Sequence, residues 1–405
     1  MSPPEPTASE RSVAGALGVA AWSVVHAAGH GGTDLWEAVV RGRTGLRPNA
    51  LSWCDRPCWV GAVPGADDSV LPPLLARWDC RNHRLAWLAL QAAAFRQAVD
   101  AAVGRHGAHR VALVLGTSTS GIGQTEQAYA ERRGTGRWPP GFDYRRSHAV
   151  DALCRFSAEA LGLQGPMVVI STACSSSAKV FLTARRWIAA GLVDAAVVGG
   201  VDSLCLSTLH GFDALQLLSG QVCRPFDVAR DGISIGEAAG FMLIDRRPAA
   251  VSFLGGGESS DAWHMSTPHP EGLGAQDAMR AALVAARLTP AEIGYVNAHG
   301  TATPANDRSE AAALSAVFGP RGVPVSSTKG VTGHTLGAAG IVEAIVTVEA
   351  LARQVLPPTA NLETPDPALD VDLVTQARAV PLRHAMSSNF GFGGSNCALV
   401  FGRTD

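Results

Sequence analysis

Short apolar runs alternate along this chain with Ala-rich stretches in which apolar positions recur every three or four residues. Apolar runs at 110–115, 167–170 and 195–198 predict strands. Residues 22–25 also alternate in the way that a strand does. The amphipathic stretch at 178–191 predicts a helix. Strands that alternate with helices are typical of an α/β protein whose sheets are at least partly parallel.

The same order of predicted elements occurs twice. Residues 111–126 resemble residues 293–310, because each segment is a strand that runs into a small-residue Gly-Thr turn. Residues 170–191 resemble residues 326–353, because each has a strand end, a turn of small residues and a helix. This recurrence indicates a duplicated unit.

Each half is predicted to close on a Gly-rich hairpin, at 233–244 in the first half and at 390–401 in the second. The turn after Arg247 is the predicted boundary between them. We therefore expect an N-terminal half at 1–247 and a C-terminal half at 248–405.

The composition agrees with a large folded protein. The chain has 405 residues, which exceeds the size at which one core keeps growing. It is 47% hydrophobic and 17% charged, a profile of a globular protein with buried strands. The 33 basic and 35 acidic residues are spread without long runs and give a net charge of -2. Nucleic acid is therefore not expected as a partner.

The sequence predicts a protein without a signal peptide or membrane span. Its cysteines are scattered through a long chain, which is more typical of a reducing cytoplasm than of a disulfide framework. The eight cysteines are Cys54, Cys58, Cys80, Cys154, Cys174, Cys205, Cys223 and Cys397.

Cys174 follows the strand-like run MVVIST and precedes a helix that is predicted to begin at about 175–178. A thiol at this junction lies at the positive end of the helix dipole, near unpaired backbone N–H groups, which lowers its pKa and favours the thiolate. Ala173 and three serines leave the sulfur approachable. Taken alone, a cysteine is more often a packing residue, so that alternative stays open here.

Two further segments carry histidines. His299 follows a predicted strand in NAHGTATP, a position where active sites of α/β folds gather, although a lone histidine is often structural. The segment STKGVTGHTLGAAG places Lys329 and His334 before a helix that contains Glu343. Its spacing does not match a phosphate-binding loop. Lys329 and Lys179 are the only lysines, and arginine cannot replace a compact ammonium group.

The last segment of interest is SSNFGFGGSNCALVFG, in which small residues surround Phe390 and Phe392. Such a backbone must turn sharply and approach something closely. One interpretation is a tight hairpin alone. The other is a group of N–H donors for an oxyanion, beside an aromatic side chain that can move.

Together these segments resemble the β-ketoacyl-acyl carrier protein synthases of the condensing-enzyme, thiolase-like superfamily. The resemblance rests on five motifs in this order: TACSSS, RPFDVARDG, NAHGTATP with NDRSE, STKGVTGHTLGAAG, and NFGFGGSN. It extends from Gly18 to the C-terminus. It implies an α/β, five-layer α-β-α-β-α thiolase-like fold made of two duplicated halves, and a dimer.

The resemblance also implies roles for individual residues. Cys174 matches the family's nucleophile. His299 and His334 match its paired histidines, and Lys329 and Glu343 match a supporting ion pair that would hold the His334 segment in place.

Other matches concern the substrate. Thr301 and Thr303 match hydroxyls that hold the phosphopantetheine arm, and Ser266 in AWHMS is a further candidate. Phe392 matches a gating phenylalanine whose N–H forms an oxyanion hole with that of the nucleophile. Ile122 in GTSTSGIGQ is a candidate for limiting the depth of the acyl pocket, or is a core residue.

The implied reaction is a decarboxylative Claisen condensation. An acyl group moves from a carrier to Cys174, and malonyl-acyl carrier protein then loses CO₂ and attacks the acyl thioester. The resemblance implies no metal and no cofactor apart from the 4′-phosphopantetheine of the acyl carrier protein. The expected partners are that carrier and a second subunit, either an identical chain or a homologue that resembles a chain-length factor.

Two positions depart from many fatty-acid members of the family. Lys179 stands where these have histidine, and Ile233 stands where they have phenylalanine. With the STKG and GVDSL wording, these departures favour a bacterial specialised pathway, such as aryl polyene assembly, over housekeeping fatty acid synthesis.

Three other functions are possible from the residues alone. A thiolase that uses coenzyme A needs a second cysteine as base, for which Cys397 is the only candidate, although it lies in a predicted strand. A non-catalytic chain-length partner would lack the nucleophile. Metal binding by Cys54 and Cys58 lacks a nearby histidine pair.

Overall fold

The computed structural model describes residues 15–404. The first 14 residues of the predicted N-terminal half, and Asp405 of the C-terminal half, lie outside the described residues.

Two sets of strands with the same order form the centre of the fold. The first set has the order β6-β5-β7-β9-β1, and the second has the order β12-β11-β16-β17-β10. In each set the first two neighbour pairs are parallel and the last two are antiparallel. The first set comprises β1 (Leu17–His26), β5 (Val111–Gly116), β6 (Met167–Ile170), β7 (Ala195–Asp202) and β9 (Ala238–Asp245). The second comprises β10 (Val251–Ser260), β11 (Tyr295–Asn297), β12 (Pro324–Ser326), β16 (His384–Gly391) and β17 (Ser395–Arg403). The repeated topology confirms the predicted duplication.

The two sets join through β1 and β10, where Leu17 pairs with Phe253 and Gly18 with Ser252. Together with short β2 (Gly29–His30) and β14 (Asp372–Leu373), they make one 12-stranded sheet. Short strands outside it form two small sheets: β3 (Arg47–Pro48), β4 (Trp59–Gly61) and β8 (Ile235–Gly236) in one, and β13 (Val355–Leu356) and β15 (Arg378–Ala379) in the other.

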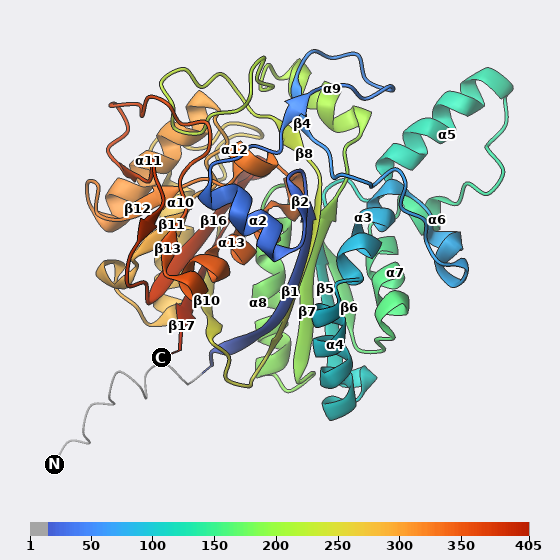
Figure 1. The fold of residues 1–405 in the computed structure, drawn as a ribbon, viewed down its shortest axis with the longest axis horizontal. Coiled ribbons are helices and arrows are strands. Elements are labelled where there is room, and N and C mark those ends of the chain that lie inside the picture. The colour runs from blue at the N-terminus through green and yellow to red at the C-terminus, as the bar shows by residue number, and fades with distance from the viewer. Residues whose placement is uncertain (1–14, 405) are drawn as a thin grey trace.

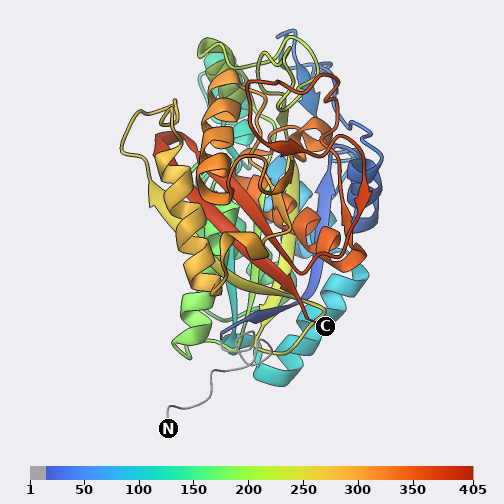
Figure 2. The same ribbon diagram turned by 90° about the vertical axis from the view of Figure 1, so that its left-hand side faces the viewer.

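Helices complete five layers, which follow one another across Figure 1. The helices α10 and α11 cover the outer face of the second strand set, as Figure 2 shows from that side. The helices α8 and α13 lie between the two sets, and α3, α4 and α7 cover the first set from outside. Their bounds are α3 (Arg81–Leu90), α4 (Ala93–His106), α7 (Ala152–Leu161), α8 (Ser176–Ala189), α10 (Leu273–Ala286), α11 (Pro304–Phe318) and α13 (Ala339–Arg353). This is the α-β-α-β-α arrangement that the sequence predicted.

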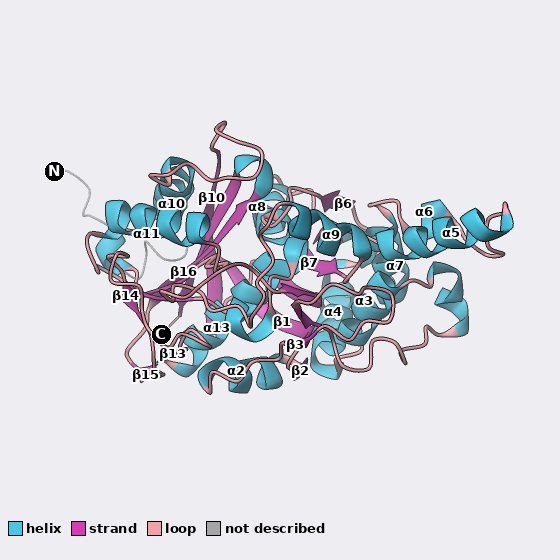
Figure 3. Ribbon diagram, turned by 90° about the horizontal axis from the view of Figure 1, so that it is seen from above, coloured by secondary structure: helices cyan, strands magenta, loops and turns pink. Residues whose placement is uncertain are grey.

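The remaining described helices are α2 (Gly32–Val40), α5 (Ile122–Thr135), α6 (Tyr144–Ser147), α9 (Leu206–Ala214) and α12 (Lys329–Thr332). Helices α2, α5 and α6 lie toward the rim in the view from above (Figure 3). Helix α5 and the loop that follows it project from the body in Figure 1.

The middle layer explains why its sequences are rich in small residues. In α13 every residue from Ala339 to Leu351 is buried. A Cβ on Gly340 would lie only 2.4 Å from the backbone N of Ala178, so α8 and α13 touch through their backbones there. Strands β7 and β9 are buried along their whole length, which accounts for their continuous apolar runs.

One predicted hairpin is correct and the other is wrong. Residues 390–401 form the turn between β16 and β17, with Phe390 paired to Asn396. Residues 233–244 do not form a hairpin, because β9 pairs with β7 and β1 instead. The long connection from β7 to β9 contains α9 and β8, and β8 pairs with β4. Its glycines serve close packing: a Cβ on Gly236 would lie 2.1 Å from the carbonyl O of Thr332.

Candidate active site

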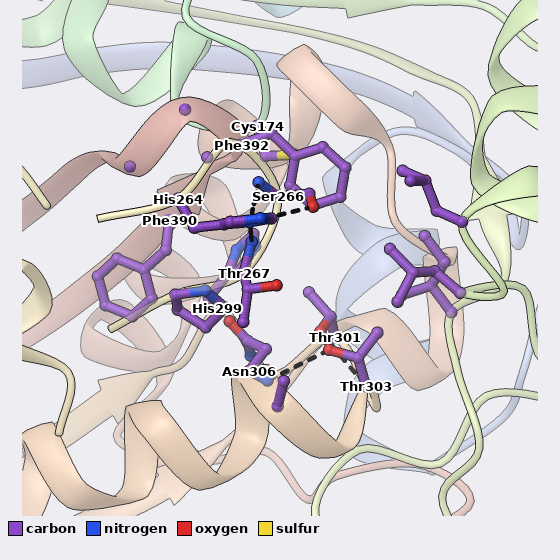
Figure 4. Close-up of a pocket in the computed structure, with 18 of the residues that line it drawn as sticks. Cys174, His264, Ser266, Thr267, His299, Thr301, Thr303, Asn306, Phe390 and Phe392 are labelled. Atoms are coloured by element: carbon purple, nitrogen blue, oxygen red, sulfur yellow. Dashed lines mark hydrogen bonds between the residues drawn. The ribbon is translucent and has the colours of Figure 1, made fainter. Parts of the chain in front are cut away.

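Cys174 lies in the turn between β6 and α8, two residues before the first residue of the helix. The residue before it, Ala173, has a left-handed backbone with φ of 52°. An L-residue is strained in that region, so the turn is over-determined by its surroundings. Only 5% of Cys174 is exposed, at the wall of a pocket with a volume of about 160 Å³ (Figure 4).

The structure brings both predicted histidines to the sulfur. His299 follows β11, and His334 follows α12. His334 Nε2 lies 2.9 Å from Cys174 Sγ, and the two imidazole rings meet edge to face with centroids 5.2 Å apart. Cys174 follows β6 and His334 lies in the loop after β12. These two strands hold equivalent places in the two halves, so equivalent loops meet at the site.

The same three side chains offer a sulfur and two ring nitrogens within 4.8 Å of one another. Two ligands of one tetrahedral zinc ion are about 3.6 Å apart, from Zn–S and Zn–N bonds of about 2.3 and 2.0 Å. The 2.9 Å separation between His334 Nε2 and Cys174 Sγ is shorter and is that of a hydrogen bond. The arrangement therefore fits proton and charge chemistry better than a metal centre.

Lys329 is buried and contacts the other histidine. Its ammonium forms an ion pair with Glu343 and donates to the backbone carbonyl of His299. It also lies 3.2 Å from His299 Nδ1. Because an ammonium can only donate, Nδ1 must accept and the ring proton is on Nε2. The ion pair joins α12 to α13 on either side of His334, as the sequence predicted, and its ammonium also contacts His299.

Two residues that the sequence analysis did not single out complete this support. Glu310 accepts hydrogen bonds from the backbone N–H groups of His299 and Gly300, each at 2.7 Å. Asn389 donates to the free oxygen of Glu343. Burial raises the pKa of Glu310 to about 7. A carboxylate in the NDRSE motif, near the histidine in sequence, was the available signal.

Burial controls the protonation of all three central side chains. It lowers the pKa of His299 and of His334 well below the usual range, and the charge of Lys329 lowers both further. Both imidazoles are therefore neutral at neutral pH. Burial also raises the pKa of the Cys174 thiol to about 12, although Lys329 and the N–H of Phe392 act in the opposite direction. The expected resting thiolate is thus corrected to a thiol, because desolvation outweighs the helix terminus.

The turn after β16 closes the pocket beside the sulfur. Phe392 lines the pocket, and its ring lies 5.3 Å from that of Phe212 of α9. Gly393 and Gly394 have φ of 80° and 74°, which favours glycine at both positions. The N–H of Phe392 points to Cys174 Sγ. It can therefore also donate to a substrate oxygen that lies beside the sulfur.

The predicted hydroxyls lie along the same pocket (Figure 4). Thr301 Oγ1 and Thr303 Oγ1 are 3.0 Å apart. Ser266 lies on the loop before α10, where His264 Nδ1 accepts its backbone N–H at 3.2 Å. His264 and an apolar wall that includes Leu215 also line the pocket, and neither was predicted from the sequence.

Three other positions named in the sequence analysis differ in their relation to the pocket. Ile122 begins α5 and is not among the described residues that line the pocket. Ile233 does line the pocket and is buried. Lys179 is not among the described residues that line it, and its ammonium lies 3.9 Å from Glu258.

The cysteines on which the thiolase and metal-binding alternatives depend lie away from Cys174 in buried clusters. Cys397 is fully buried in β17, as a packing residue of the core. Cys54 and Cys58 are buried in an apolar cluster that includes Leu204. Among the residues that the structure describes, neither cysteine belongs to a group of three or more side chains that could hold a metal ion.

Comparisons with known proteins agree with this fold and site. Residues 82–250 match the N-terminal domain of β-ketoacyl synthases, and residues 252–363 match the C-terminal domain. The 3-oxoacyl-[acyl-carrier-protein] synthase 2 of Vibrio harveyi is 35% identical over 90% of this chain and 93% of its own length. Nodulation protein E of Rhizobium meliloti is 36% identical over 91% of this chain and 94% of its own length.

A solved structure is also similar. The ketosynthase of Xenorhabdus doucetiae, determined in complex with its chain length factor, is 39% identical and superposes with a TM-score of 0.88 over 96% of this chain and 98% of its own. The fold is thus that of the thiolase-like condensing enzymes. Within that class, the chain belongs to the β-ketoacyl synthase family, which makes it an enzyme of the acyltransferase type. Among residues 15–404, every helix falls short of the length and apolar character that crossing a membrane requires.

Proposed function

We propose that this enzyme catalyses the decarboxylative condensation of an acyl group on Cys174 with malonyl-acyl carrier protein, which gives a β-ketoacyl-acyl carrier protein. The observation that carries this proposal is the meeting of one buried thiol with two neutral imidazoles. A reaction that holds an electrophile on sulfur and then generates an enolate beside it needs this combination.

In the first step, Cys174 Sγ attacks the thioester carbonyl of an acyl carrier. The new S–C bond forms as the thiol loses its proton, and the carrier leaves as a thiol that takes up a proton. The N–H groups of Cys174 and Phe392 receive the negative oxygen of the tetrahedral intermediate. Phe392, which contacts Phe212 across the pocket, would gate the entry of the acyl chain.

In the second step, malonyl-acyl carrier protein enters, its C–C bond to the carboxylate breaks, and the carboxylate leaves as CO₂. The electron pair moves into the thioester, and His299 and His334 donate from Nε2 to the enolate oxygen. Lys329 fixes the Nε2 tautomer of His299. The enolate carbon then attacks the acyl-Cys174 carbonyl, and the Cys174 sulfur leaves and regains a proton.

The substrates would be carried on 4′-phosphopantetheine, with no metal and no other cofactor. Thr301, Thr303 and Ser266 would bind this arm, since their hydroxyls line the approach to the sulfur. Ile122 would limit the acyl pocket only in a larger assembly, because it is not among the described residues that line the pocket of the single chain.

We also propose the wider setting. The partners are acyl carrier protein and a second subunit, identical or resembling a chain-length factor, in the cytoplasm. Similarity to a ketosynthase solved with its chain length factor supports the second option, and with Lys179 and Ile233 it favours a specialised pathway such as aryl polyene assembly. The division of the chain at Arg247 stays our interpretation of the repeat.

The direct test is acyl loading. Radiolabelled acyl-acyl carrier protein should label the wild-type enzyme, and Cys174→Ala should abolish the label. Cys397→Ala is the matched control, because Cys397 is equally buried but belongs to the core of β17. Label that persists in Cys174→Ala would overturn the proposal, and label lost in Cys397→Ala would favour a thiolase-type site.

The histidines are tested by separating the two steps. His299→Ala and His334→Ala should retain self-acylation, because the nucleophile and the two N–H donors remain. Malonyl decarboxylation should fall by about 100- to 1000-fold, the usual effect of removing one oxyanion donor. Equal loss of both steps would contradict these assigned roles.

A further inference from the structure

A buried carboxylate lies behind the three central side chains and has no part in the steps above. Asp202 ends β7 and is fully buried. Its Oδ1 accepts from Thr117 Oγ1 at 2.6 Å and from the N–H and the hydroxyl of Thr119, each at 2.8 Å. Both oxygens accept the N–H of Ser118 at 2.9 Å. Its Oδ2 accepts the N–H of Gly337 at 2.6 Å.

These donors come from two separate loops. One is the loop at 117–119 that follows β5, and it reaches the nucleophile: Ser118 Oγ donates to the carbonyl of Ala173 at 3.1 Å. That carbonyl belongs to the strained residue immediately before Cys174. The loop at 117–119 therefore supports the turn that presents the sulfur.

The other loop carries His334. On one side its backbone is held by β8 and the residue before it: the N–H of His334 donates to the carbonyl of Ser234 at 2.7 Å, and the His334 carbonyl accepts the N–H of Gly236 at 3.0 Å. On the other side the chain passes through Gly337, whose N–H is the donor to Asp202. A Cβ at Gly337 would lie 2.7 Å from Asp202 Oδ2 and from Ser118 N, so the two loops touch at this point.

We propose that Asp202 is a positioning residue of the condensing site, which fixes the His334 loop against the turn of Cys174. This inference rests on the proposed function. Its physical basis is that one fully buried carboxylate satisfies N–H groups of both loops at once, so neither loop can move without leaving a buried donor unpaired. The 2.9 Å contact between His334 Nε2 and Cys174 Sγ depends on this tie.

The variant Asp202→Asn separates the two loops chemically. Its amide keeps one oxygen, which stays with the larger set of donors at 117–119. The NH₂ group then faces the N–H of Gly337, and two donors repel. The Cys174 turn is retained while the His334 loop is released. Asp245→Asn is the matched control, because Asp245 is a buried carboxylate at the opposite end of the β7 and β9 pair.

We expect Asp202→Asn to retain self-acylation but to lower malonyl decarboxylation about 100-fold, with KM for the malonyl carrier unchanged. In a His334→Ala background, the same substitution should have no further effect on decarboxylation. Asp245→Asn should leave both steps unchanged. Equal loss of both steps, or an additive loss in the His334→Ala background, would overturn the proposal.

The exposed Ser118 supplies a second variant, which should fold readily. Ser118→Ala removes the hydrogen bond to Ala173 and should give the opposite pattern. Self-acylation should slow about fivefold, the effect of one lost hydrogen bond. An unchanged rate of self-acylation would contradict the claim that the loop at 117–119 supports the turn of Cys174.

One measurement does not depend on the reaction at all. Ring ¹⁵N chemical shifts of His334 in ¹⁵N-histidine-labelled enzyme should change in Asp202→Asn and stay the same in Asp245→Asn. If they do not change in Asp202→Asn, the inference fails even for an active condensing enzyme. If they change but wild-type enzyme does not decarboxylate malonyl carrier, the proposed function fails and the positioning role stands.

Discussion

At the scale of single residues, Lys329 influences most of the site. Its ammonium is paired with Glu343, fixes the tautomer of His299 and lowers the pKa of both histidines. The same charge opposes the rise in the pKa of Cys174 that burial causes. One buried cation thereby favours neutral imidazoles and also limits the rise in the pKa of the thiol. Arginine would not supply the same compact point charge.

Lys329→Met should therefore raise the pKa of His299, because a positive neighbour that disfavours the imidazolium is removed. In the wild type the imidazole loses its function only at very acidic pH, after protonation. In the variant, this acid limb of malonyl decarboxylation should move to higher pH. NMR titration of labelled histidine measures the shift directly.

Lys179→Met is the matched control, since Lys179 is the only other lysine and its partner is Glu258. It should leave the titration of His299 unchanged. The electrostatic account is wrong if both variants behave alike, or if the pKa of His299 falls in Lys329→Met.

At the scale of elements, the contact between α8 and α13 connects the nucleophile with its support. Helix α8 begins next to Cys174, and α13 carries Glu343. Gly340 permits the backbones to touch, because a Cβ there would lie 2.4 Å from Ala178 N. The middle layer thus sets the distance between the two halves of the site.

Gly340→Ala should push these helices apart and cost about 1–3 kcal/mol of unfolding free energy, as overpacking does. Gly104→Ala in α4 is the control, because nothing lies within 4 Å of its Cβ position. There the substitution should stabilise by about 0.5–1 kcal/mol. Denaturant unfolding measures both, and a neutral Gly340→Ala would show that the helices adapt.

At the scale of the whole molecule, the two halves share one core. Strands β1 and β10 pair, and Phe181 of α8 packs against Phe253 and Phe401, with ring centroids 5.4 and 5.7 Å apart. The first of these rings belongs to the N-terminal half and the other two to the C-terminal half. Neither half can expose this cluster without exposing the core of the other.

We therefore expect a single unfolding transition in which circular dichroism and tryptophan fluorescence coincide. Phe181→Ala should lower the stability of the whole chain by about 3–5 kcal/mol, the usual cost of deleting a buried aromatic ring. Two separate transitions would show that the halves unfold independently.

Local pattern was enough for much of this molecule. The strands expected at 167–170 and 195–198 are β6 and the first part of β7. The helix expected at 178–191 is α8, which starts two residues earlier. Strand β7 is buried along its whole length and α8 buries one face, so their apolar positions follow the burial of each element, whereas β6 is only half-buried. The order of the motifs also predicted that Cys174, His299, His334 and Lys329 belong to one site.

Contacts between distant segments required the tertiary structure. The segment at 233–244 is also Gly-rich, but Gly236 permits the close approach of Thr332 and Gly240 that of Ile341, and neither forms a hairpin turn. Lys329 pairs with Glu343 as predicted, but its second contact, with His299 30 residues away along the chain, was not predicted.

Cys174 shows most clearly what local sequence determines and what the tertiary structure determines. The sequence determined where the thiol lies, at the start of a helix, because local pattern decides where helices begin. Its protonation was decided by desolvation and by the charge of Lys329, which depend on everything that packs around the sulfur. The tie through Asp202 is of the same kind, since its donors come from loops more than 200 residues apart that only the assembled layers bring within 3 Å.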